Sequence, residues 1–408
     1  MNMNHSKSFV IIGAGPAGYQ TALELRKLDK ESQIYLFEKD RAGGACLHYG
    51  CIPSKQLQSI ESEADYLKTL KKNKTLLEKG LLTKFKEQNI NFINEEANYS
   101  YDEKLDKFII KSKSQNLKCD YLILALGSKP RKLNIKTKKE IIDSDIFFSE
   151  EYLSKGFHNS YCFIGGGYIA VELASMLASL GKKVRILEKE AEILNFLDSK
   201  ARDLIKNNLK KQGIKIETGL EIINFDEIEE EIIFEAIGRE AVKINSNEAM
   251  EQVSNKKLFT IGDMDTEIPL AHLAYAQARE LAAKIYAKDL QKHNLDLVPQ
   301  VIFTIPEFAH IGPSLKKLDT EKKDNYEVIE KSWASNAKAR ITKNDRGYFR
   351  LIIEKKTRKI LACTLIGKGA TDLISVIIPP INLGLSLDEL SSMIFPHPTL
   401  GEIFIETT

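Results

Sequence analysis

Cys46 and Cys51 have four residues between them in the stretch GGACLHYGCIPSKQL, which covers residues 43–57. Two thiols at this spacing can form a redox-active disulfide or supply half of a metal site. A metal site needs two more ligands at compatible spacing. The other three cysteines are scattered through apolar, strand-like segments, which is typical of small core residues: Cys119, Cys162 and Cys363. The sequence therefore favours a redox pair and predicts no metal.

The residues after the second cysteine indicate how its reactivity is set. Pro53 follows Cys51 closely, and a helical pattern begins near Ser54. This arrangement places Cys51 at a helix N-terminus, where the positive end of the helix dipole lowers a thiol pKa. We therefore expect Cys51 to favour the thiolate, the form of cysteine that takes part in disulfide exchange.

A glycine-rich turn lies near the start of the chain, in SFVIIGAGPAGYQTALEL. An apolar strand over residues 9–12 leads into Gly13, Gly15 and Gly18, and a helical pattern follows. Such spacing gives a tight turn, a close approach for a pyrophosphate and close packing of helix on strand. The free N–H groups of the helix N-terminus favour a phosphate. The next strand ends at Glu38, where a carboxylate is expected to accept the ribose hydroxyls.

The same pattern recurs in SYCFIGGGYIAVELASMLASLGKKVRILEKE. Gly165, Gly167 and Ala170 occupy the three turn positions, and Glu188 closes the following strand. A carboxylate at this place repels a 2′-phosphate and accepts a bond from a free 2′-hydroxyl, so NAD is favoured over NADP. Arg185 is the nearby cation, but it lies within the strand and not at its end.

Length and composition bound the possibilities further. A chain of 408 residues with 43% hydrophobic and 28% charged residues indicates a globular protein of two or three domains. A net charge of +2 argues against a nucleic-acid partner. The longest mostly apolar stretch, residues 162–180, contains Glu172 and three consecutive glycines, so no membrane span is expected. The cysteine content and an N-terminus that reads as a strand favour the cytoplasm.

The cysteine segment resembles the redox-active motif of the pyridine nucleotide–disulfide oxidoreductases, the flavoprotein family that contains dihydrolipoamide dehydrogenase and glutathione reductase. Similar motifs follow in the family's order over most of the chain. They are LILALGSKP (122–130), EAIGRE (235–240), LFTIGDM (258–264), LAHLAYAQA (270–278), FTIPEFAHIG (303–312) and FPHPTLGE (395–402).

The resemblance implies an α/β fold with two Rossmann-like dinucleotide-binding domains, for FAD and for NAD, and an α+β interface domain for dimerisation. We expect the FAD domain at residues 1–150 and 255–296, a shortened NAD domain at 151–254, and the interface domain at 297–408. Both nucleotide domains should hold parallel sheets. The alternating runs GYFRLIIE and KILACTLIG predict an antiparallel sheet in the interface domain, followed by helices.

The resemblance also implies roles for the reacting groups. Cys46 would be the interchange thiol facing the substrate, and Cys51 the thiol facing the flavin. His397 would be the acid–base residue, oriented by Glu402. In the family this pair comes from the partner subunit, so a homodimer with a shared active site is expected.

Further residues match cofactor contacts of the family. Lys55 and Glu172 resemble its ion pair beside the reactive flavin nitrogen, Asp263 the residue that holds the ribitol chain, and Tyr168 the aromatic covering the nicotinamide pocket. The residues expected to contact FAD or NAD are Gly13, Gly15, Gly18, Glu38, Gly44, Lys55, Gly127, Asp263, Ala271, Gly165, Gly167, Tyr168, Ala170, Glu188 and Gly238.

Three readings of the function follow. The leading one is a dihydrolipoamide dehydrogenase-like enzyme that passes electrons from a dithiol, with a lipoyl group favoured, to NAD. The second is a reductase of another disulfide, similar to glutathione reductase; Ala170 leans that way, whereas Glu188 disfavours NADPH. The third is a degenerate flavoprotein acting as a binding subunit, because the NAD segment has lost material after GIKIETG (213–219).

Overall fold

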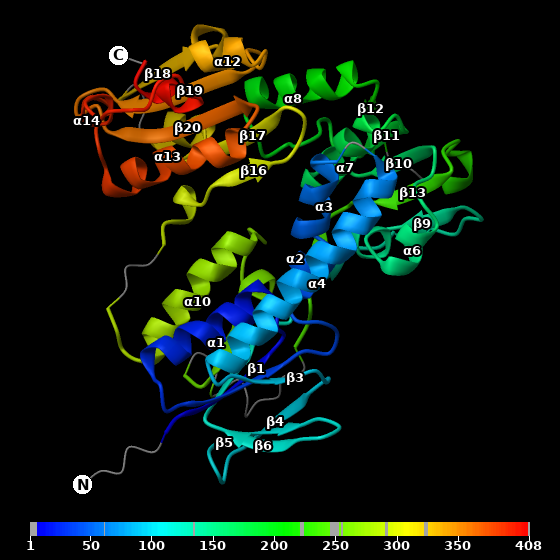
Figure 1. Ribbon diagram of the computed structural model, residues 1–408, viewed down its shortest axis with the longest axis vertical. Coiled ribbons are helices and arrows are strands. Elements are labelled where there is room, and N and C mark those ends of the chain that lie inside the picture. Colours follow the sequence, from blue (N-terminus) through cyan, green and yellow to red (C-terminus); the bar gives the residue numbers. More distant parts are fainter. Residues whose placement is uncertain are drawn as a thin grey trace. The chain divides into compact units, whose positions relative to one another are not determined.

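The computed structural model describes residues 6–60, 62–133, 135–220, 224–244, 253, 256–289, 293–321 and 325–406. The chain forms two compact units, each assembled from separate segments (Figure 1). Unit 1 holds Met1–Lys132, Ile142–Phe157 and Gly238–Lys292, and unit 2 holds Leu133–Ile141, His158–Ile237 and His293–Thr408. The predicted boundary at residues 254 and 255, and the end of the last domain at 408, lie outside the described residues. The division into three domains stays a prediction.

Unit 1 is built on a five-stranded parallel sheet with the strand order β15-β7-β1-β2-β3. The strands are β1 (Ser8–Ile12), β2 (Gln33–Phe37), β3 (Asn91–Ile93), β7 (Tyr121–Leu124) and β15 (Leu258–Thr260). Helices α1 (Pro16–Leu28) and α10 (Ala271–Ile285) lie side by side against it (Figure 1). The predicted parallel sheet is confirmed.

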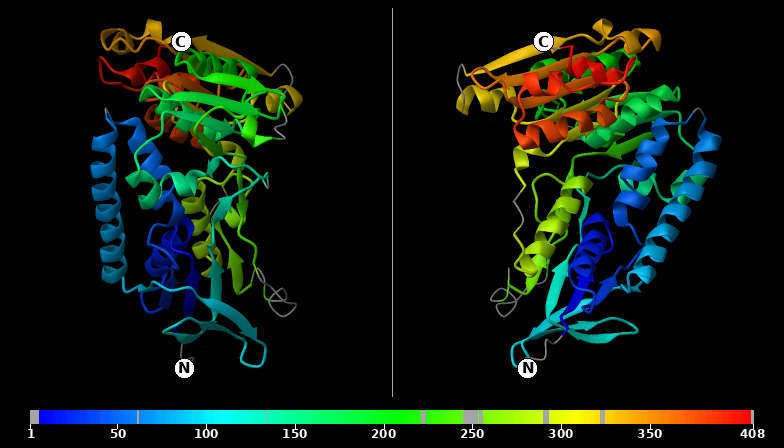
Figure 2. Two further views of the ribbon diagram at one scale, coloured as in Figure 1. Left: turned by 90° about the vertical axis from the view of Figure 1, so that its right-hand side faces the viewer. Right: turned by 60° about the vertical axis from the view of Figure 1, so that its left-hand side comes forward.

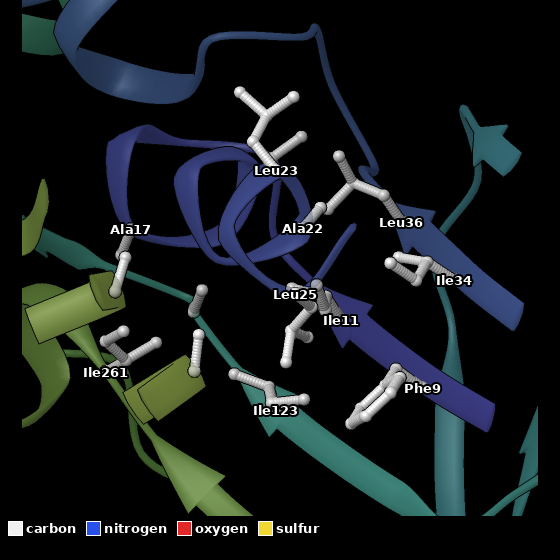
Figure 3. Packing of buried hydrophobic residues seen from close by; sticks show 14 of the residues in the cluster. Phe9, Ile11, Ala17, Ala22, Leu23, Leu25, Ile34, Leu36, Ile123 and Ile261 are labelled. Atoms are coloured by element: carbon white, nitrogen blue, oxygen red, sulfur yellow. The ribbon is translucent and has the colours of Figure 1, made fainter. Parts of the chain in front are cut away.

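The core of unit 1 lies between this sheet and its helices (Figure 3). Ala22 and Leu25 of α1 are fully buried and point toward the apolar side chains of β1 and β2. Every side chain from Phe9 to Ile11 in β1 is fully buried, which explains the unbroken apolar run in the sequence. Strands covered on both faces have this pattern because neither side meets water.

The remaining elements of unit 1 are short, apart from one helix. β4 (Asn98–Asp102), β5 (Lys107–Lys111) and β6 (Asn116–Cys119) form an antiparallel sheet, and β8 (Ser128–Pro130) pairs antiparallel with β14 (Arg239–Ala241). The helices are α2 (Gly44–His48), α3 (Cys51–Gln58), α4 (Glu63–Glu87), α5 (Ser144–Phe147) and α6 (Glu150–Ser154), with the 3-10 turn η2 (Gly262–Met264).

Helix α4 is the longest of unit 1, and Figure 2 shows it as one straight rod. Ser62 caps its start by accepting a bond from the Asp65 N–H. Its first turn carries two acidic residues and its last turn two lysines, which suits the helix dipole. Within the described ranges no helix combines the length and apolar character needed to cross a bilayer.

Unit 2 contains a second five-stranded sheet, with the strand order β12-β11-β10-β13-β9. Its strands are β9 (Glu140–Ile142), β10 (Ser160–Ile164), β11 (Lys183–Glu188), β12 (Lys215–Thr218) and β13 (Ile232–Glu235), of which the last four pair in parallel. Helices α7 (Tyr168–Ser179) and α8 (Ser199–Lys211) connect them. Between β12 and β13 the described residues form only the 3-10 turn η1 (Phe225–Glu227), where the sequence predicts lost material.

The C-terminal part of unit 2 is an antiparallel sheet, ordered β16-β17-β20-β19-β18. Its strands are β16 (Gln300–Ile302), β17 (Glu307–Ile311), β18 (Tyr326–Lys331), β19 (Tyr348–Glu354) and β20 (Ile360–Gly367). The accompanying helices are α11 (Leu315–Glu321), α12 (Ala337–Ile341), α13 (Ala370–Leu383) and α14 (Leu387–Ser391), with the 3-10 turns η3 (Leu295–Leu297), η4 (Trp333–Ser335) and η5 (Leu400–Phe404). The predicted antiparallel strands and following helices are confirmed.

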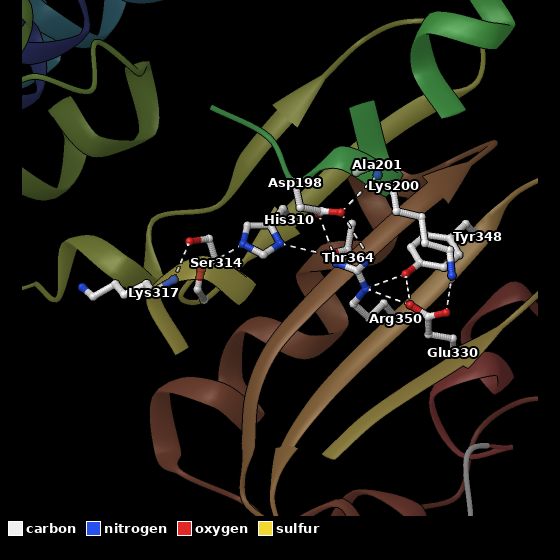
Figure 4. A network of polar contacts seen from close by, with 11 residues as sticks. Asp198, Lys200, Ala201, His310, Ser314, Lys317, Glu330, Tyr348, Arg350 and Thr364 are labelled. Carbon is white, nitrogen blue, oxygen red and sulfur yellow. Dashed lines mark hydrogen bonds and ion pairs between the residues drawn. The ribbon is translucent and has the colours of Figure 1, made fainter. Parts of the chain in front are cut away.

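A network of charged groups joins α8 to the C-terminal sheet inside unit 2 (Figure 4). Arg350 is only 3% exposed and pairs with Asp198 at 3.1 Å and Glu330 at 3.2 Å. Asp198 also caps α8 by accepting a bond from the Ala201 N–H. The buried guanidinium therefore has two carboxylate partners, as a desolvated charge requires.

The close packing of the first glycine turn can be tested by adding one methyl group. A Cβ at Gly18 would lie 1.8 Å from the Gly13 carbonyl oxygen. We expect Gly18→Ala to lower the free energy of unfolding by about 1–3 kcal/mol, in the range of other overpacked sites, measured by urea denaturation.

Gly80→Ala is the matched control, since a Cβ there meets nothing within 4 Å. Gly80 lies inside α4, so alanine should stabilise the helix by up to about 1 kcal/mol. Equal effects of the two substitutions would contradict the packing described above.

Candidate active site

The first glycine turn is held in shape by the carboxylate that follows β2. Gly13 has a φ of +103°, and a Cβ there would lie 2.2 Å from the Ala125 carbonyl oxygen, so only glycine fits. Glu38 accepts bonds from the Ala14 N–H at 2.8 Å and the Asp40 N–H at 3.0 Å. The predicted ribose-binding residue thus braces the turn that is predicted to face a pyrophosphate.

The cysteine segment packs directly onto this turn. The Gly43 N–H donates to the Ala14 carbonyl at 2.9 Å. A Cβ on Gly44 would lie 2.7 Å from the Gly15 Cα, so the two backbones meet without side chains between them. This contact explains why the segment needs its paired glycines immediately before Cys46.

The helix that carries Cys51 begins earlier than the sequence suggests. The predicted start near Ser54 is wrong by three residues, because α3 begins at Cys51 and includes Pro53 in its first turn. Proline fits there because the first turn needs no N–H donor. Cys46 lies in a separate short helix, α2, which the sequence analysis did not identify.

The two thiols lie close enough to share a proton. The pKa of the Cys46 thiol is raised above its ordinary value, mainly by a hydrogen bond to Cys51 and then by burial. Lys55, one turn after Cys51 on α3, acts in the opposite direction on the Cys46 pKa. The Cys46 thiol therefore holds its proton more firmly than an ordinary thiol.

Two tyrosines of unit 1 interact electrostatically with the thiol pair, and the sequence analysis did not identify them. The hydroxyl groups of Tyr19 on α1 and Tyr275 on α10 lie 2.7 Å apart. Burial raises the pKa of both phenols, and negative charge on the thiol pair raises it further; the bond from Tyr19 opposes this at Tyr275. Both phenols therefore stay protonated beside the thiol pair.

A polar chain connects the two turns that the resemblance singled out in unit 1. Asp263 accepts a bond from the Ser128 hydroxyl at 2.7 Å, next to Gly127. Arg239, which follows Gly238, donates to the same hydroxyl at 2.9 Å and pairs with Asp145 at 2.8 Å. Sequence reasoning missed this arginine, although it stood inside the quoted motif EAIGRE.

Several features of unit 1 fit an FAD molecule. The contacts of Gly13, Gly18 and Gly44 leave no room for a Cβ, and Asp263 offers a carboxylate within the η2 turn. Helix α10 begins at Ala271 without a side-chain cap, and the N–H groups of a helix N-terminus favour an anionic ligand. Neutral and anionic acceptors of a flavin nucleotide suit these donors.

The second glycine turn repeats the arrangement of the first. Gly165 has the same φ of +103°, and Gly167 caps α7. Glu188 accepts bonds from the Gly166 N–H at 2.5 Å and the Glu190 N–H at 2.8 Å, and Ala170 is fully buried beneath the turn. The geometry therefore fits a second dinucleotide.

Arg185, the cation near Glu188 in the chain, already pairs with carboxylates of unit 2. The Arg185 guanidinium pairs with Glu230 at 2.7 Å and lies 3.6 Å from Glu217. Because these two carboxylates balance its charge, the Arg185 guanidinium is a poor partner for a 2′-phosphate. This agrees with the preference for NAD inferred from Glu188.

Tyr168 and Glu172 lie on α7 in unit 2. The Tyr168 ring stacks on Phe196 with the ring centres 4.4 Å apart, and its hydroxyl donates to Gln300 at 3.4 Å. Glu172 is buried and accepts a bond from the Phe303 N–H at 2.9 Å. Lys55 belongs to unit 1, so its predicted pairing with Glu172 stays a prediction.

The predicted C-terminal pair is brought together by a tight turn. His397 Nδ1 lies 2.8 Å from the Glu402 carboxylate, while the other carboxylate oxygen accepts the Thr399 N–H at 2.7 Å. These two bonds lower the pKa of Glu402, the Thr399 bond more strongly. The histidine side chain is 74% exposed, so its other face is open to a reacting group.

Comparison with known proteins identifies the family. The pyridine nucleotide-disulphide oxidoreductase family matches residues 7–240, and its dimerisation domain matches residues 298–408. The chain belongs to the pyridine nucleotide-disulphide oxidoreductases. The α/β fold class and the family resemblance are therefore confirmed, and the protein is an oxidoreductase that uses FAD and NAD.

Curated relatives of this oxidoreductase are named dihydrolipoyl dehydrogenase. The one from Mycoplasma genitalium is 28% identical over 450 aligned positions, covering 97% of this chain and 96% of the relative. The one from Geobacillus stearothermophilus is 28% identical, covering 97% and 94% of the two chains.

Solved structures support the fold. LpdA from Mycobacterium tuberculosis aligns with a TM-score of 0.88 at 18% identity, covering 98% of both chains. A HOCl-induced flavoprotein disulfide reductase from Escherichia coli aligns with a TM-score of 0.86 at 22% identity, covering 98% of this chain and 99% of that one.

The His397–Glu402 geometry of the oxidoreductase makes a direct prediction. The Glu402 carboxyl should titrate below the ordinary glutamate pKa of about 4.3. The ionised Glu402 carboxylate then stabilises the turn fully above about pH 4.3. This stabilisation is lost as the pH falls through the lowered pKa. Carbon-13 NMR of the labelled glutamate carboxyls, assigned with Glu402→Gln, measures it.

His397→Ala should move the Glu402 pKa only part of the way back, because the Thr399 bond is the larger cause. A Glu402 carboxyl that titrates at the ordinary value in the unaltered protein would contradict the described turn.

Proposed function

We propose that the protein oxidises a dihydrolipoyl-type dithiol and reduces NAD, using the Cys46–Cys51 pair and FAD as carriers. The observation that carries the proposal is the thiol pair itself, hydrogen-bonded and packed onto the first glycine turn. The names of the curated relatives favour the lipoyl substrate over other dithiols.

The first half of the reaction is thiol–disulfide exchange. One substrate thiolate attacks Cys46 Sγ of the protein disulfide, the Sγ–Sγ bond breaks, and the electron pair leaves on Cys51. The second substrate thiolate then attacks the mixed disulfide and releases Cys46. The substrate leaves as a disulfide, and the protein holds the two electrons as the Cys46–Cys51 dithiol.

The second half returns the pair to the disulfide. Bound FAD supplies two-electron transfer between the dithiol and NAD⁺, which yields NADH and a proton. In this half, Cys51 holds the negative charge and Cys46 the proton, as their hydrogen bond favours. Lys55, one turn further along α3, places a cation beside the pair.

His397 and Glu402 are proposed as the acid–base pair. The imidazole takes the proton of the incoming thiol, and Glu402 fixes the ring through Nδ1 and stabilises the charged form. We further propose that this pair serves the thiols of the partner subunit, in a homodimer formed through the region that matches the dimerisation domain.

We also carry over the cofactor contacts named above as proposals. In unit 1, Gly13, Gly15, Gly18, Glu38, Gly44, Gly127, Asp263 and Ala271 would contact FAD. In unit 2, Gly165, Gly167, Tyr168, Ala170 and Glu188 would contact NAD. The Lys55–Glu172 pair, the contact made by Gly238, the three-domain division and a cytoplasmic location remain part of the same proposal.

An anaerobic NADH titration of the purified protein tests the electron path. We expect loss of flavin absorbance and a long-wavelength band, because the proposed mechanism puts the Cys51 thiolate, at the start of α3, beside the flavin. Turnover of dihydrolipoamide with NAD should exceed turnover with NADP by about tenfold or more, since Glu188 disfavours a 2′-phosphate by an amount on the order of 1.4 kcal/mol.

Cys51→Ser is the control for that experiment. It should keep the flavin reducible by NADH and lose the long-wavelength band. A flavin that dithionite reduces and NADH leaves unchanged would sink the proposed electron path and favour a binding role.

The shared active site can be tested by complementation. Cys46→Ser and His397→Gln should each lower dithiol oxidation by about a hundredfold or more, as expected when exchange chemistry or acid–base catalysis is removed. Mixed dimers of the two variants should recover about a quarter to a half of the activity, because one intact site can form. Activity that stays absent after subunit exchange, shown complete by mass spectrometry, would contradict a site shared across the dimer.

A further inference from the structure

Helix α2, which carries Cys46, ends on a histidine with an unusual environment. The His48 side chain is 1% exposed, and its Nε2 lies 2.9 Å from the Ala42 carbonyl oxygen. A carbonyl oxygen only accepts, so Nε2 carries the proton. This bond ties the last residue of α2 to the residue just before Gly43.

The other ring nitrogen is left unsatisfied. His48 Nδ1 is buried and has no hydrogen-bond partner among the residues that the structure describes. With the proton on Nε2, Nδ1 is an acceptor without a donor, which costs free energy in a buried site. The structure tolerates this cost while keeping the bond to Ala42.

The charged groups around the ring are already committed. Arg41, which precedes α2, binds Glu78 of α4 through two nitrogens, at 3.2 Å and 2.5 Å. Lys74 of α4 is buried and donates to the Phe148 carbonyl at 3.1 Å. The neighbouring Tyr49 donates to Asp40 at 2.8 Å.

A proton on Nδ1 is therefore poorly placed. It would be a buried donor without an acceptor, and it would add a charge beside two cations, with one carboxylate already shared. Burial lowers the pKa of His48; the Ala42 bond and Glu78 oppose this, while Arg41 and Lys74 add to it. Lys74 keeps its charge at neutral pH, since its pKa is lowered only to about 8, mainly by burial.

We propose that His48 is a positioning residue for the thiol pair: its neutral ring holds α2, and with it Cys46, in place, and a proton on Nδ1 releases the helix. The functional meaning rests on the proposed redox role of the pair. The release of α2 at low pH does not rest on that role, so an experiment can contradict either proposal without the other.

The direction of the pH effect follows from linkage. In an opened segment His48 has an ordinary pKa of about 6.5, above that of the closed form. Opening thus takes up a proton, and the closed form is fully stable above pH 6.5. Below that value the stability of α2 is lost as the pH falls toward the lowered pKa.

His310 in unit 2 provides a matched comparison. It is half-buried, its pKa is also lowered, and its Nε2 lies 2.9 Å from the Gly312 carbonyl oxygen. Its Nδ1 differs, because it has a partner in the Thr364 hydroxyl at 2.9 Å (Figure 4). His310 therefore serves as a control: it shares the lowered pKa and the carbonyl bond of His48, but it is not on the helix that carries Cys46.

Hydrogen exchange read by mass spectrometry tests the proposal on the reduced, FAD-loaded protein. Protection of the peptide covering residues 44–50 is followed from pH 7.5 to 5.0 and corrected for intrinsic exchange. The reporter includes the Tyr49 N–H, which donates to the Ala45 carbonyl at 2.8 Å. We expect protection to fall by up to about tenfold per pH unit below pH 6.5.

Two substitutions at His48 separate the bond from the titration. His48→Gln keeps a donor the same number of bonds from Cβ but does not titrate, so protection should match the unaltered protein within about threefold at pH 7.5 and stay flat in acid. His48→Leu removes the donor and should lower protection by about fivefold or more at every pH. His310→Gln should keep the acid-dependent fall.

The proposal is overturned if protection of residues 44–50 in the unaltered protein stays flat down to pH 5.0, or if His48→Gln shows the same fall. The unaltered protein decides the first point even where a variant fails to fold. Dihydrolipoamide turnover lost at pH 7.5 with the exchange pattern intact would instead count against the proposed function alone.

Discussion

The contact between two glycine backbones, Gly15 at the start of α1 and Gly44 at the start of α2, is the constraint on which the site depends. It brings the cysteine segment against the first dinucleotide turn with no side chain between them. The Gly43 bond to Ala14 fixes the same approach. Because Cys46 follows Gly44 by two residues, the place of its backbone relative to the turn is set by this contact and not by flexible side chains.

The electrostatics of the thiol pair follow from that placement. Cys51 begins a helix and Cys46 lies in the helix before it, so the two sulfurs differ in surroundings although they lie close together. The hydrogen bond to Cys51 and burial raise the pKa of Cys46. The phenols of Tyr19 and Tyr275 interact electrostatically with the thiol pair and stay protonated, because burial and negative charge on the pair raise their pKa.

Much of the fold could be predicted because it depends on local pattern. The apolar runs before Gly13 and Gly165, and the carboxylates Glu38 and Glu188 that follow the next strands, indicate two parallel sheets directly. The pairing of His397 with Glu402 is local for the same reason, since five residues and a turn join them.

What the sequence could not reveal depends on contacts between distant segments or on burial. Arg239 reaches Ser128 and Asp145 only once β14 pairs with β8. His48 looks like any residue of a polar loop until α4 covers it. The start of α3 was misplaced because proline was read as lying before the helix, whereas the first turn accepts it without losing a bond.

The bracing carboxylates have one more consequence. Glu38 and Glu188 each hold their turn through two backbone N–H groups, and these bonds need no ligand. The turns are thus preorganised, and a nucleotide that arrives has little chain entropy left to remove. A dinucleotide that binds at either proposed site therefore meets a turn whose backbone is already braced by a carboxylate.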